Sequence, residues 1–343
     1  MTTITDTRLA NLAGWVGRQL DRETISLEPL GGDAGARRYF AIVGVDHLLA
    51  VDAPPATENT MQFVRVAQLL DQHHITVPEI AASDPEQGFV LIEYWQGGVF
   101  GAELNAGTAP LLYGEALLKL LAIQQIPVST AEFLPIYDAA FIRRELALLN
   151  EWFLQELLGM VLTPAELELL EQLFSLLEAS ALAQPQVVMH RDYHSRNLVF
   201  GRSGQLATID FQDAVLGPLT YDVVSLLKDC YYRLPSDQAR QWALAYGDMA
   251  IDAGIMPPLS ADTYLRYFDW MGLQRHLKVL GIFSRLHLRD GKPGYLNDLP
   301  RVLGYVMDTF YDYPELKDFS NWFEQRVMPL CRARPWYTQE ANL

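Results

Sequence analysis

Two short segments in the second half of the chain carry the residue types that phosphoryl transfer requires. Asp192 and Asn197 stand five residues apart, and Asp210 follows Asn197 by thirteen positions. A carboxylate can accept or orient the proton of an attacking hydroxyl, while an amide oxygen and a second carboxylate can hold Mg²⁺ on a triphosphate. Mg²⁺ prefers such oxygen ligands and completes its coordination with water and phosphate. This spacing therefore favours a catalytic role for Asp192 and magnesium ligation by Asn197 and Asp210.

The residues between Asn197 and Asp210 are predicted to form a β-hairpin. Leu198–Phe200 and Leu206–Ile209 are apolar and flank the turn at Gly201–Gly204. A hairpin brings its two ends together, so Asn197 and Asp210 are expected at the same end and able to ligate one metal cluster. The competing interpretation is that these polar residues only form turns and helix caps.

The surrounding sequence predicts a small sheet followed by a larger helical region, which is an α+β arrangement. Short apolar or alternating segments predict four strands, at Ile25–Glu28, Arg38–Val43, His47–Val51 and Phe89–Tyr94. Apolar residues at helical spacing predict two helices, at Leu9–Leu20 and Phe63–Leu70. Helical spacing dominates from Ile142 onward, apart from the hairpin region, and Thr163–Glu166 is typical of a capping box. The glycines in Trp95–Gly98 indicate the join, so the predicted domains are residues 1–95 and 96–343.

The composition limits the classes of partner and compartment. The chain of 343 residues has 26 Lys and Arg against 42 Asp and Glu, a formal net charge of −16. Such a surface disfavours nucleic acid and membrane surfaces, and an anionic ligand such as ATP would need local cations or backbone N–H groups. Cys230 and Cys331 are too few for a disulfide framework, which favours reduced thiols in a cytoplasmic protein. No secretory signal or membrane-spanning stretch is visible, and no protein partner is evident.

The chemical segments resemble a known family. The pattern His190-x-Asp192-x4-Asn197, followed by Ile209–Phe211 with Asp210 at its centre, is similar to the motifs of the aminoglycoside phosphotransferase and choline kinase-like family, and the element order is similar over almost the whole chain. The resemblance implies a bilobal protein-kinase-like fold, with a nucleotide-binding N-lobe and a catalytic and acceptor-binding C-lobe. It also implies ATP and Mg²⁺ as cofactors, Asp192 as catalytic base, and Asn197 and Asp210 as magnesium ligands.

Two further segments refine the resemblance. Pro218–Asp222 is similar to a family segment whose Asp braces the catalytic loop, although a plain helix N-cap is compatible with Asp222. His190–Asn197 and Asp210–Pro218 resemble the bacterial cell-wall-sugar kinases of the family. That likeness implies phosphorylation of the anomeric hydroxyl of N-acetylmuramate, N-acetylglucosamine or both in peptidoglycan recycling. The competing functions are a choline, ethanolamine or aminoglycoside kinase, and a pseudokinase that binds nucleotide without turnover.

The nucleotide site departs from the protein-kinase pattern. The third predicted strand, His47–Val51, has no Lys, and Phe63 stands near the position expected for the Glu of the usual ion pair. Arg37 and Arg38 are the candidate replacements at the phosphates, and exposed arginines at a strand edge are the alternative.

Backbone groups are expected to make the remaining nucleotide contacts. Gly31, Gly32 and Gly35 could let backbone N–H groups approach the phosphates, or could form an ordinary turn. In the resembling fold the adenine meets the strand that contains Glu93 and Trp95, which is why these two residues are predicted to contact the nucleotide.

Four residues are candidates for contact with the acceptor or the transferred phosphate. His194 stands two residues after the predicted base and could donate a hydrogen bond, and Asp213 follows Asp210 by three positions. Arg275 and Lys278 share a helix face and would suit a carboxylate on the sugar. The alternatives are a histidine satisfied within its loop, a turn carboxylate and a buried helix face.

Overall fold

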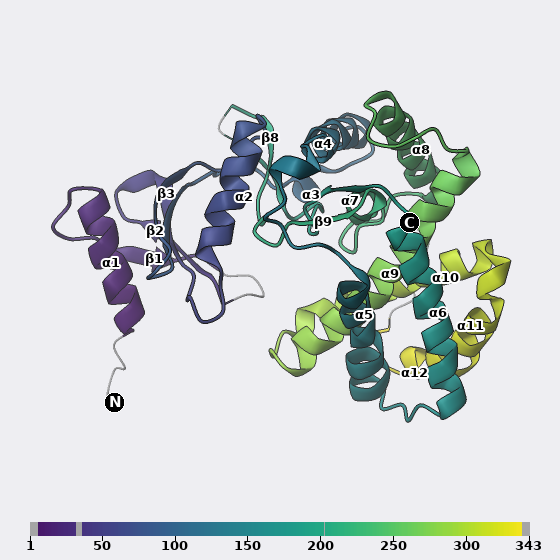
Figure 1. Cartoon of the computed structure of the whole chain (residues 1–343). Coiled ribbons are helices and arrows are strands. Elements are labelled where there is room, and N and C mark those ends of the chain that lie inside the picture. Colours follow the sequence, from purple (N-terminus) through teal and green to yellow (C-terminus); the bar gives the residue numbers. More distant parts are fainter. Residues whose placement is uncertain (1–5, 32–35, 202, 338–343) are drawn as a thin grey trace. The chain divides into compact units, whose positions relative to one another are not determined.

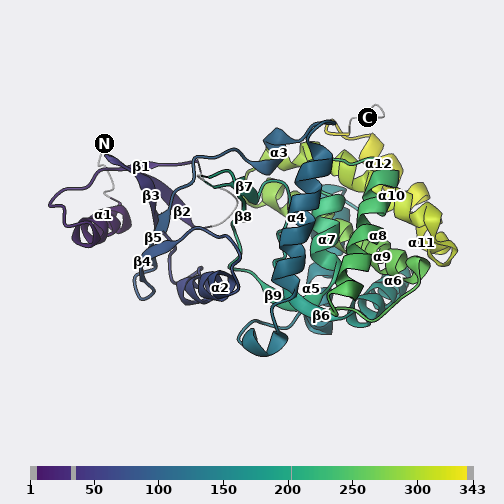
Figure 2. The ribbon, with the colours of Figure 1, turned by 90° about the horizontal axis from the view of Figure 1, so that it is seen from above.

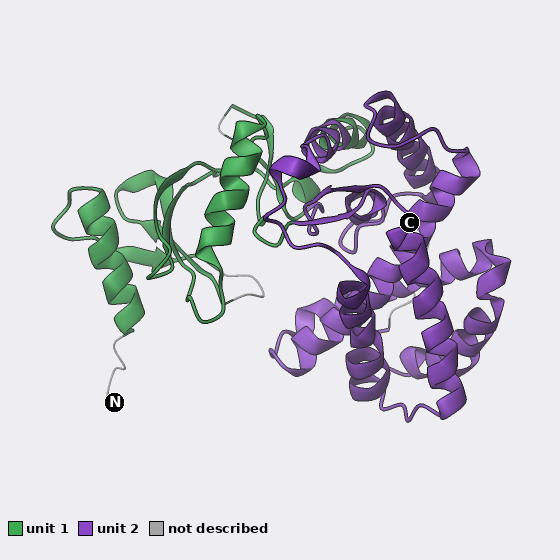
Figure 3. Cartoon of the chain, viewed as in Figure 1, with its two compact units in different colours: residues 1–116, 196–214 green, residues 117–195, 215–343 purple. Residues whose placement is uncertain are grey.

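The computed structural model describes residues 6–31, 36–201 and 203–337, and it divides into two compact units (Figure 3). The first unit contains residues 1–116 and 196–214, and the second contains residues 117–195 and 215–343. The predicted domains, residues 1–95 and 96–343, stay a prediction; the first compact unit also contains residues 96–116 and 196–214. The predicted α+β class is confirmed.

The first unit is built on a five-stranded antiparallel sheet (Figure 1). The strand order is β1-β2-β3-β5-β4. The elements of this unit, with α4 continuing into the second, are α1 (Thr7–Gln19), β1 (Leu27–Pro29), β2 (Arg38–Ile42), β3 (Val45–Asp52), α2 (Thr60–Gln72), β4 (Ile80–Asp84), β5 (Phe89–Glu93), α3 (Phe100–Glu103), α4 (Ala109–Gln124), β7 (Leu198–Phe200) and β8 (Leu206–Thr208). The strand pattern in the sequence therefore located four of the five sheet strands, while the half-exposed β4 carried no clear alternation signal.

The two faces of the sheet are covered by different helices. Leu12 and Trp15 of α1 belong to one apolar core with Phe40, Ala50 and Leu91, which point to the same face of their strands. Side chains alternate between faces along a strand, so Tyr39, Val51 and Val90 point to the opposite face, where Phe63 of α2 lies beside them. The same alternation sends Arg37 and Arg38 to opposite faces, and only Arg37 is on the α2 face.

The β7–β8 hairpin belongs to the first unit and pairs as predicted (Figures 1 and 2). Leu198 faces Thr208 in the antiparallel register, and the Ile209 N–H donates to the Asn197 carbonyl at 3.0 Å. Gly97 lies against the hairpin so closely that a Cβ there would come within 1.8 Å of the Phe200 carbonyl oxygen. Only glycine permits this approach, which holds the chain after β5 against the hairpin.

The second unit is helical and contains one two-stranded ladder, in which β6 pairs with β9. Helix α9 is its centre, with residues buried on all sides, and it packs on helices before and after it in the chain. The remaining elements are η1 (Val128–Thr130), α5 (Ala139–Leu148), η2 (Leu149–Leu157), α6 (Pro164–Leu182), β6 (Gln186–Met189), β9 (Val215–Pro218), α7 (Thr220–Leu227), α8 (Ser236–Asp252), α9 (Ala261–Leu288), η3 (Pro293–Asp298), α10 (Leu299–Asp312), η4 (Pro314–Leu316), α11 (Lys317–Trp322), η5 (Phe323–Val327) and α12 (Met328–Arg332).

Two local predictions for this unit, the capping box and the free thiols, are confirmed. Thr163 and Glu166 form the reciprocal hydrogen bonds of a capping box at the start of α6. Cys230 and Cys331 are both buried free thiols. Over the described residues, no helix is both long and apolar enough to cross a membrane.

Candidate active site

The loop after β6 carries the predicted base and is held by two carboxylates of the second unit. The Asp222 side chain accepts the backbone N–H groups of His190 at 2.6 Å and of Arg191 at 3.0 Å. Arg191 has a φ of +75°, in the left-handed region that non-glycine residues seldom occupy. Asp229 accepts the backbone N–H of Ser195 at 2.9 Å, at the other end of the loop. These bonds stabilise a strained loop, and the predicted bracing role of Asp222 is confirmed.

Asp222 makes the stability of this unit pH-dependent. Burial raises the pKa of Asp222 to about 7, because the two backbone hydrogen bonds do not offset the loss of solvation. The ordinary pKa of the group is 3.8. Between these values the folded chain binds a proton that the unfolded chain releases, so this contribution to stability is present at acid pH and is lost as pH rises through 7.

We expect this group to lower the unfolding free energy by about 1 kcal/mol when the pH is raised from 6 to 8. Urea unfolding of the ligand-free protein at several pH values measures the change. The Asp222→Asn variant lacks the titrating carboxyl, so its unfolding free energy should fall less over the same range. Equal slopes for the two proteins would assign the pH dependence to other groups.

The charge around Asp192 favours its ionised form. The carboxyl is in the second unit, and burial opposes its ionisation, but the positive charges of Lys278, His194, Arg191 and Arg275 outweigh burial and hold its pKa below the usual range. A base with this environment is ionised at neutral pH. The structure therefore brings Arg275 and Lys278 into the electrostatic surroundings of Asp192, while their predicted contact with a sugar carboxylate stays a prediction.

Lys278 is already engaged in a buried network. Its Nζ lies 2.7 Å from Glu145 Oε1 and donates to Tyr221 Oη at 2.8 Å. Arg191 Nη2 lies 3.0 Å from the same Glu145 oxygen, and the Tyr137 hydroxyl donates to Glu145 Oε2 at 2.5 Å. The single Glu145 carboxylate thus pairs with two cations, Lys278 and Arg191. The direct substrate contact predicted for Lys278 stays a prediction.

Asn197 and Asp210 lie together in the first unit, at one end of the hairpin as predicted. Asn197 Nδ2 is 3.4 Å from Asp210 Oδ2, and Gln212 Nε2 donates to Asp210 Oδ1 at 2.7 Å. Asp210 has a φ of +64°, a strained conformation that places its side chain at the turn out of β8. The Asn197 amide, which is near the carboxylate through its nitrogen, also carries an oxygen, and an amide oxygen and a carboxylate are hard donors of the type that fits Mg²⁺ with phosphate and water as the further ligands.

Arg37 lies in the electrostatic neighbourhood of Asp210. Its Nη2 lies 2.9 Å from Glu58 Oε2, and its guanidinium is 5.2 Å from the ring centroid of Phe63. Burial disfavours the charged guanidinium, but Tyr39, Glu58 and Asp210 outweigh that effect and raise the pKa of Arg37. Phe63, at the position where protein kinases have a Glu, stacks on Phe211 at a centroid distance of 5.1 Å. Arg37, just before β2, and Glu58, before α2, therefore form an ion pair in a chain that lacks the Lys–Glu pair of protein kinases.

Arg38 is on the other face of the sheet. Its Nη2 lies 2.5 Å from Asp52 Oδ2, and its Nη1 is paired with Asp6. Arg8 of α1 pairs with the same Asp52 carboxylate. Nothing in the structure joins Arg38 to Asp210 among the described residues, so of the two candidate arginines only Arg37 is positioned near the predicted magnesium ligands.

The remaining residues predicted to contact the nucleotide are Gly31, Gly32, Gly35, Glu93 and Trp95. Gly31 is exposed at the end of the segment after β1, while Gly32 and Gly35 lie outside the described residues. The Glu93 backbone N–H donates to the Glu79 carbonyl at 2.8 Å, and Trp95 is half-buried just after β5. These contacts remain predictions.

Near His194 the structure shows residues that the sequence did not indicate. The Tyr231 ring packs edge-on against His194 at a centroid distance of 5.2 Å, and Asp229, which binds the Ser195 N–H, also accepts the Tyr231 N–H at 2.8 Å. Asp213 is exposed and belongs to the first unit. Asp229, Tyr231, Glu145 and Glu58 occur in no recognisable spacing, so the sequence offered no signal for them.

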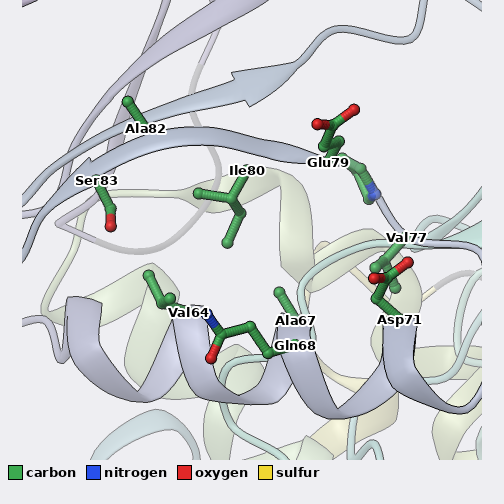
Figure 4. Close-up of a pocket in the computed structure, with 10 residues that line it drawn as sticks. Val64, Ala67, Gln68, Asp71, Val77, Glu79, Ile80, Ala82 and Ser83 are labelled. Carbon is green, nitrogen blue, oxygen red and sulfur yellow. The ribbon is translucent and has the colours of Figure 1, made fainter.

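A separate groove of about 380 Å³ lies between α2 and β4 (Figure 4). Its lining includes Val64, Gln68 and Ile80, with the carboxylates of Asp71 and Glu79 near one end. No predicted site residue in the described part of the chain lines this groove. Its acidic end also disfavours an anionic nucleotide, so the groove is not assigned to the active site.

The comparisons with known proteins agree with the fold and the motif geometry. Residues 26–259 match the family model described as the phosphotransferase enzyme family, and the chain belongs to this family. An N-acetylmuramate/N-acetylglucosamine kinase of Pseudomonas putida is 39% identical over 326 residues, covering 92% of this chain and 95% of that protein. A kinase of the same name from Pseudomonas aeruginosa is 43% identical over 295 residues, covering 86% of each chain.

Solved structures extend the likeness to the kinase-like fold. An ADP-bound aminoglycoside phosphotransferase has a TM-score of 0.60 at 15% identity, covering 88% of this chain and 99% of that chain. A choline kinase of Streptococcus pneumoniae has a TM-score of 0.62 at 15% identity, covering 88% of this chain and 100% of that one. The predicted family, fold and class of enzyme are confirmed, and the protein is a phosphotransferase with a kinase-like fold.

Proposed function

We propose that this phosphotransferase transfers the γ-phosphoryl group of ATP to the anomeric hydroxyl of N-acetylmuramate, N-acetylglucosamine or both. The supporting observation is the ionised Asp192 carboxylate on a loop braced by Asp222, in a chain similar over nearly its full length to kinases named for these two sugars. The aminoglycoside and choline kinases with similar structures are 15% identical to this chain, a likeness that shows the fold and not the acceptor.

In the proposed reaction, the sugar hydroxyl oxygen forms a bond to the γ-phosphorus while the bond from that phosphorus to the β–γ bridging oxygen breaks. The hydroxyl proton passes to the Asp192 carboxylate, and ADP leaves with the electron pair of the broken bond. Asp192 aligns the hydroxyl, and the surrounding cations keep it ionised until the proton arrives. His194, two residues further on, is proposed to donate a hydrogen bond to the transferred phosphate.

Asn197 and Asp210 are proposed to hold Mg²⁺ through their side-chain oxygens. Bound there, the ion would neutralise charge on the triphosphate. Arg37 is proposed to add a fixed positive charge at the phosphates, held by Glu58 in place of the missing Lys–Glu pair. Backbone groups around Gly31–Gly35 and at Glu93 and Trp95 are proposed to contact the remainder of the nucleotide. Asp213 is proposed to contact the sugar.

The proposed location is the cytoplasm. The ATP supply and the two buried free thiols are consistent with it. A small-molecule sugar and a nucleotide are the proposed partners, with no nucleic acid, membrane or protein partner in the reaction.

A panel assay with purified protein, ATP and Mg²⁺ tests this function. N-acetylmuramate and N-acetylglucosamine should be phosphorylated far more efficiently than choline, ethanolamine or kanamycin, as measured by ADP release and product mass. The phosphorus NMR spectrum of the sugar product should show coupling of phosphorus to H1. Phosphorylation of choline or kanamycin alone would contradict the proposed acceptor, and nucleotide binding without transfer to any acceptor would indicate a pseudokinase.

A further inference from the structure

Arg275 on α9 is a buried cation without an ion-pair partner. The residue is 5% exposed. Its guanidinium contacts Cys230 Sγ at 3.6 Å, and over the described residues it forms no salt bridge and its Nε has no hydrogen-bond partner. A buried charge without a paired carboxylate is costly, so such a group in a folded protein indicates that an anion binds there.

The neighbouring cations Lys278 and Arg191, by contrast, both have an ion-pair partner. Lys278 is bound to Glu145 and Tyr221, and Arg191 is paired with the same Glu145 carboxylate. Glu145 is therefore unavailable to Arg275. Among the described residues, Arg275 is thus the member of this group of cations that has no ion pair with a carboxylate.

The environment also keeps Arg275 charged. Burial opposes the charged form, but Cys230, Tyr221, Asp192 and Asp229 outweigh burial and raise its pKa further. Asp192 is the proton acceptor of the proposed reaction, and Asp229 accepts two backbone N–H groups. Neither carboxylate forms a direct ion pair with Arg275.

The residues that follow α7 contact both Arg275 and the loop that carries Asp192. Cys230, which contacts Arg275, stands between Asp229, which binds the catalytic loop at Ser195, and Tyr231, which packs on His194. Asp229 therefore holds both the loop of the predicted base and the aromatic ring next to it.

We propose that Arg275 is an anion subsite for a carboxylate carried by the acceptor sugar. This inference rests on the proposed function. N-acetylmuramate differs from N-acetylglucosamine by a lactyl ether that ends in a carboxylate. Arg275 would bind that group and would have no counterpart to bind on N-acetylglucosamine, so it sets the preference between the two sugars.

The test is the ratio of kcat/KM for the two sugars in the Arg275→Gln variant. Loss of a charge-assisted hydrogen bond should lower kcat/KM for N-acetylmuramate about 10- to 100-fold more than for N-acetylglucosamine, for which the smaller loss reflects weaker stabilisation of the ionised Asp192. Arg275→Lys should retain part of the preference because it retains the charge. Arg266→Gln is the matched control: this residue is on the same helix, but its side chain is 44% exposed and paired with Glu315.

Each outcome separates the subsite from the underlying activity. Equal losses for both sugars would mean that Arg275 is structural or acts on the phosphate, which overturns the subsite. Failure of the wild-type protein to phosphorylate either sugar would overturn the proposed function instead. If Arg275→Gln does not fold, the wild-type protein compares N-acetylmuramate with its uncharged lactyl carboxamide, and equal kcat/KM values for the two would overturn the proposal.

Discussion

Replacement of Asp192 by Asn is expected to lower kcat about 100- to 10,000-fold, while the fold and ATP binding are retained. Asn has nearly the same shape as Asp but can neither accept the proton of the sugar hydroxyl nor carry the negative charge that Lys278 and Arg275 surround. Turnover is measured by ADP release with saturating sugar, ATP binding by calorimetry, and folding by circular dichroism and thermal unfolding.

The control for this variant is Asp237→Asn, because Asp237 is exposed in the first turn of α8. It should leave kcat within about twofold. Near wild-type turnover by Asp192→Asn would remove Asp192 from the role of base. Loss of the thermal unfolding transition would show that the carboxylate is needed to balance the buried cations.

Replacement of Asp210 by Asn should weaken binding of the magnesium–nucleotide complex by at least about 100-fold, since loss of a direct ligand should exceed the 10- to 100-fold effect of supporting residues. Asn tolerates the positive φ of +64° at this position, whereas Ala would add backbone strain to the loss of the carboxylate. Calorimetric titrations of ATP with and without Mg²⁺ measure the effect, together with the Mg²⁺ concentration required for half-maximal activity.

Asp46→Asn is the matched control in the same unit, because the Asp46 side chain is 96% exposed. It should bind magnesium–ATP as the wild-type protein does. An unchanged magnesium requirement in Asp210→Asn would contradict the assignment of Asp210 as a ligand. Weakening of ATP binding to the same extent in the absence of Mg²⁺ would also contradict it, because the carboxylate would then act on the fold or on the nucleotide directly.

The local predictions succeeded where short-range rules operate. The hairpin between Asn197 and Asp210 was predictable because two apolar segments flank a glycine-containing turn, and its ends must then meet. The capping box at Thr163 and Glu166 was predictable because both partners lie within one helical turn. Strand β4 was not located, since the residue types of Ile80–Asp84 do not alternate between apolar and polar, although their burial does.

Charge pairing over long sequence separations was not predictable. Arg37 and Arg38 are adjacent in the chain and equal in type, yet Arg38 pairs with Asp52 and Asp6 while Arg37 pairs with Glu58. The alternation of side chains along β2 separates them, and the helices on the two faces then decide which acids they meet. Lys278 and Arg275 likewise share a helix face, but only Lys278 reaches Glu145.

The sequence alone therefore determined the type of chemistry, the identity of Asp192, Asn197 and Asp210 as its candidates, and the family to which the chain belongs, because these depend on residue types at close spacing. Tertiary structure decided which cations are neutralised and which keep a free charge. Glu145 and Glu58 come from segments far from their partners in the chain, and only folding brings a carboxylate close enough to bind one cation and leave the next unpaired.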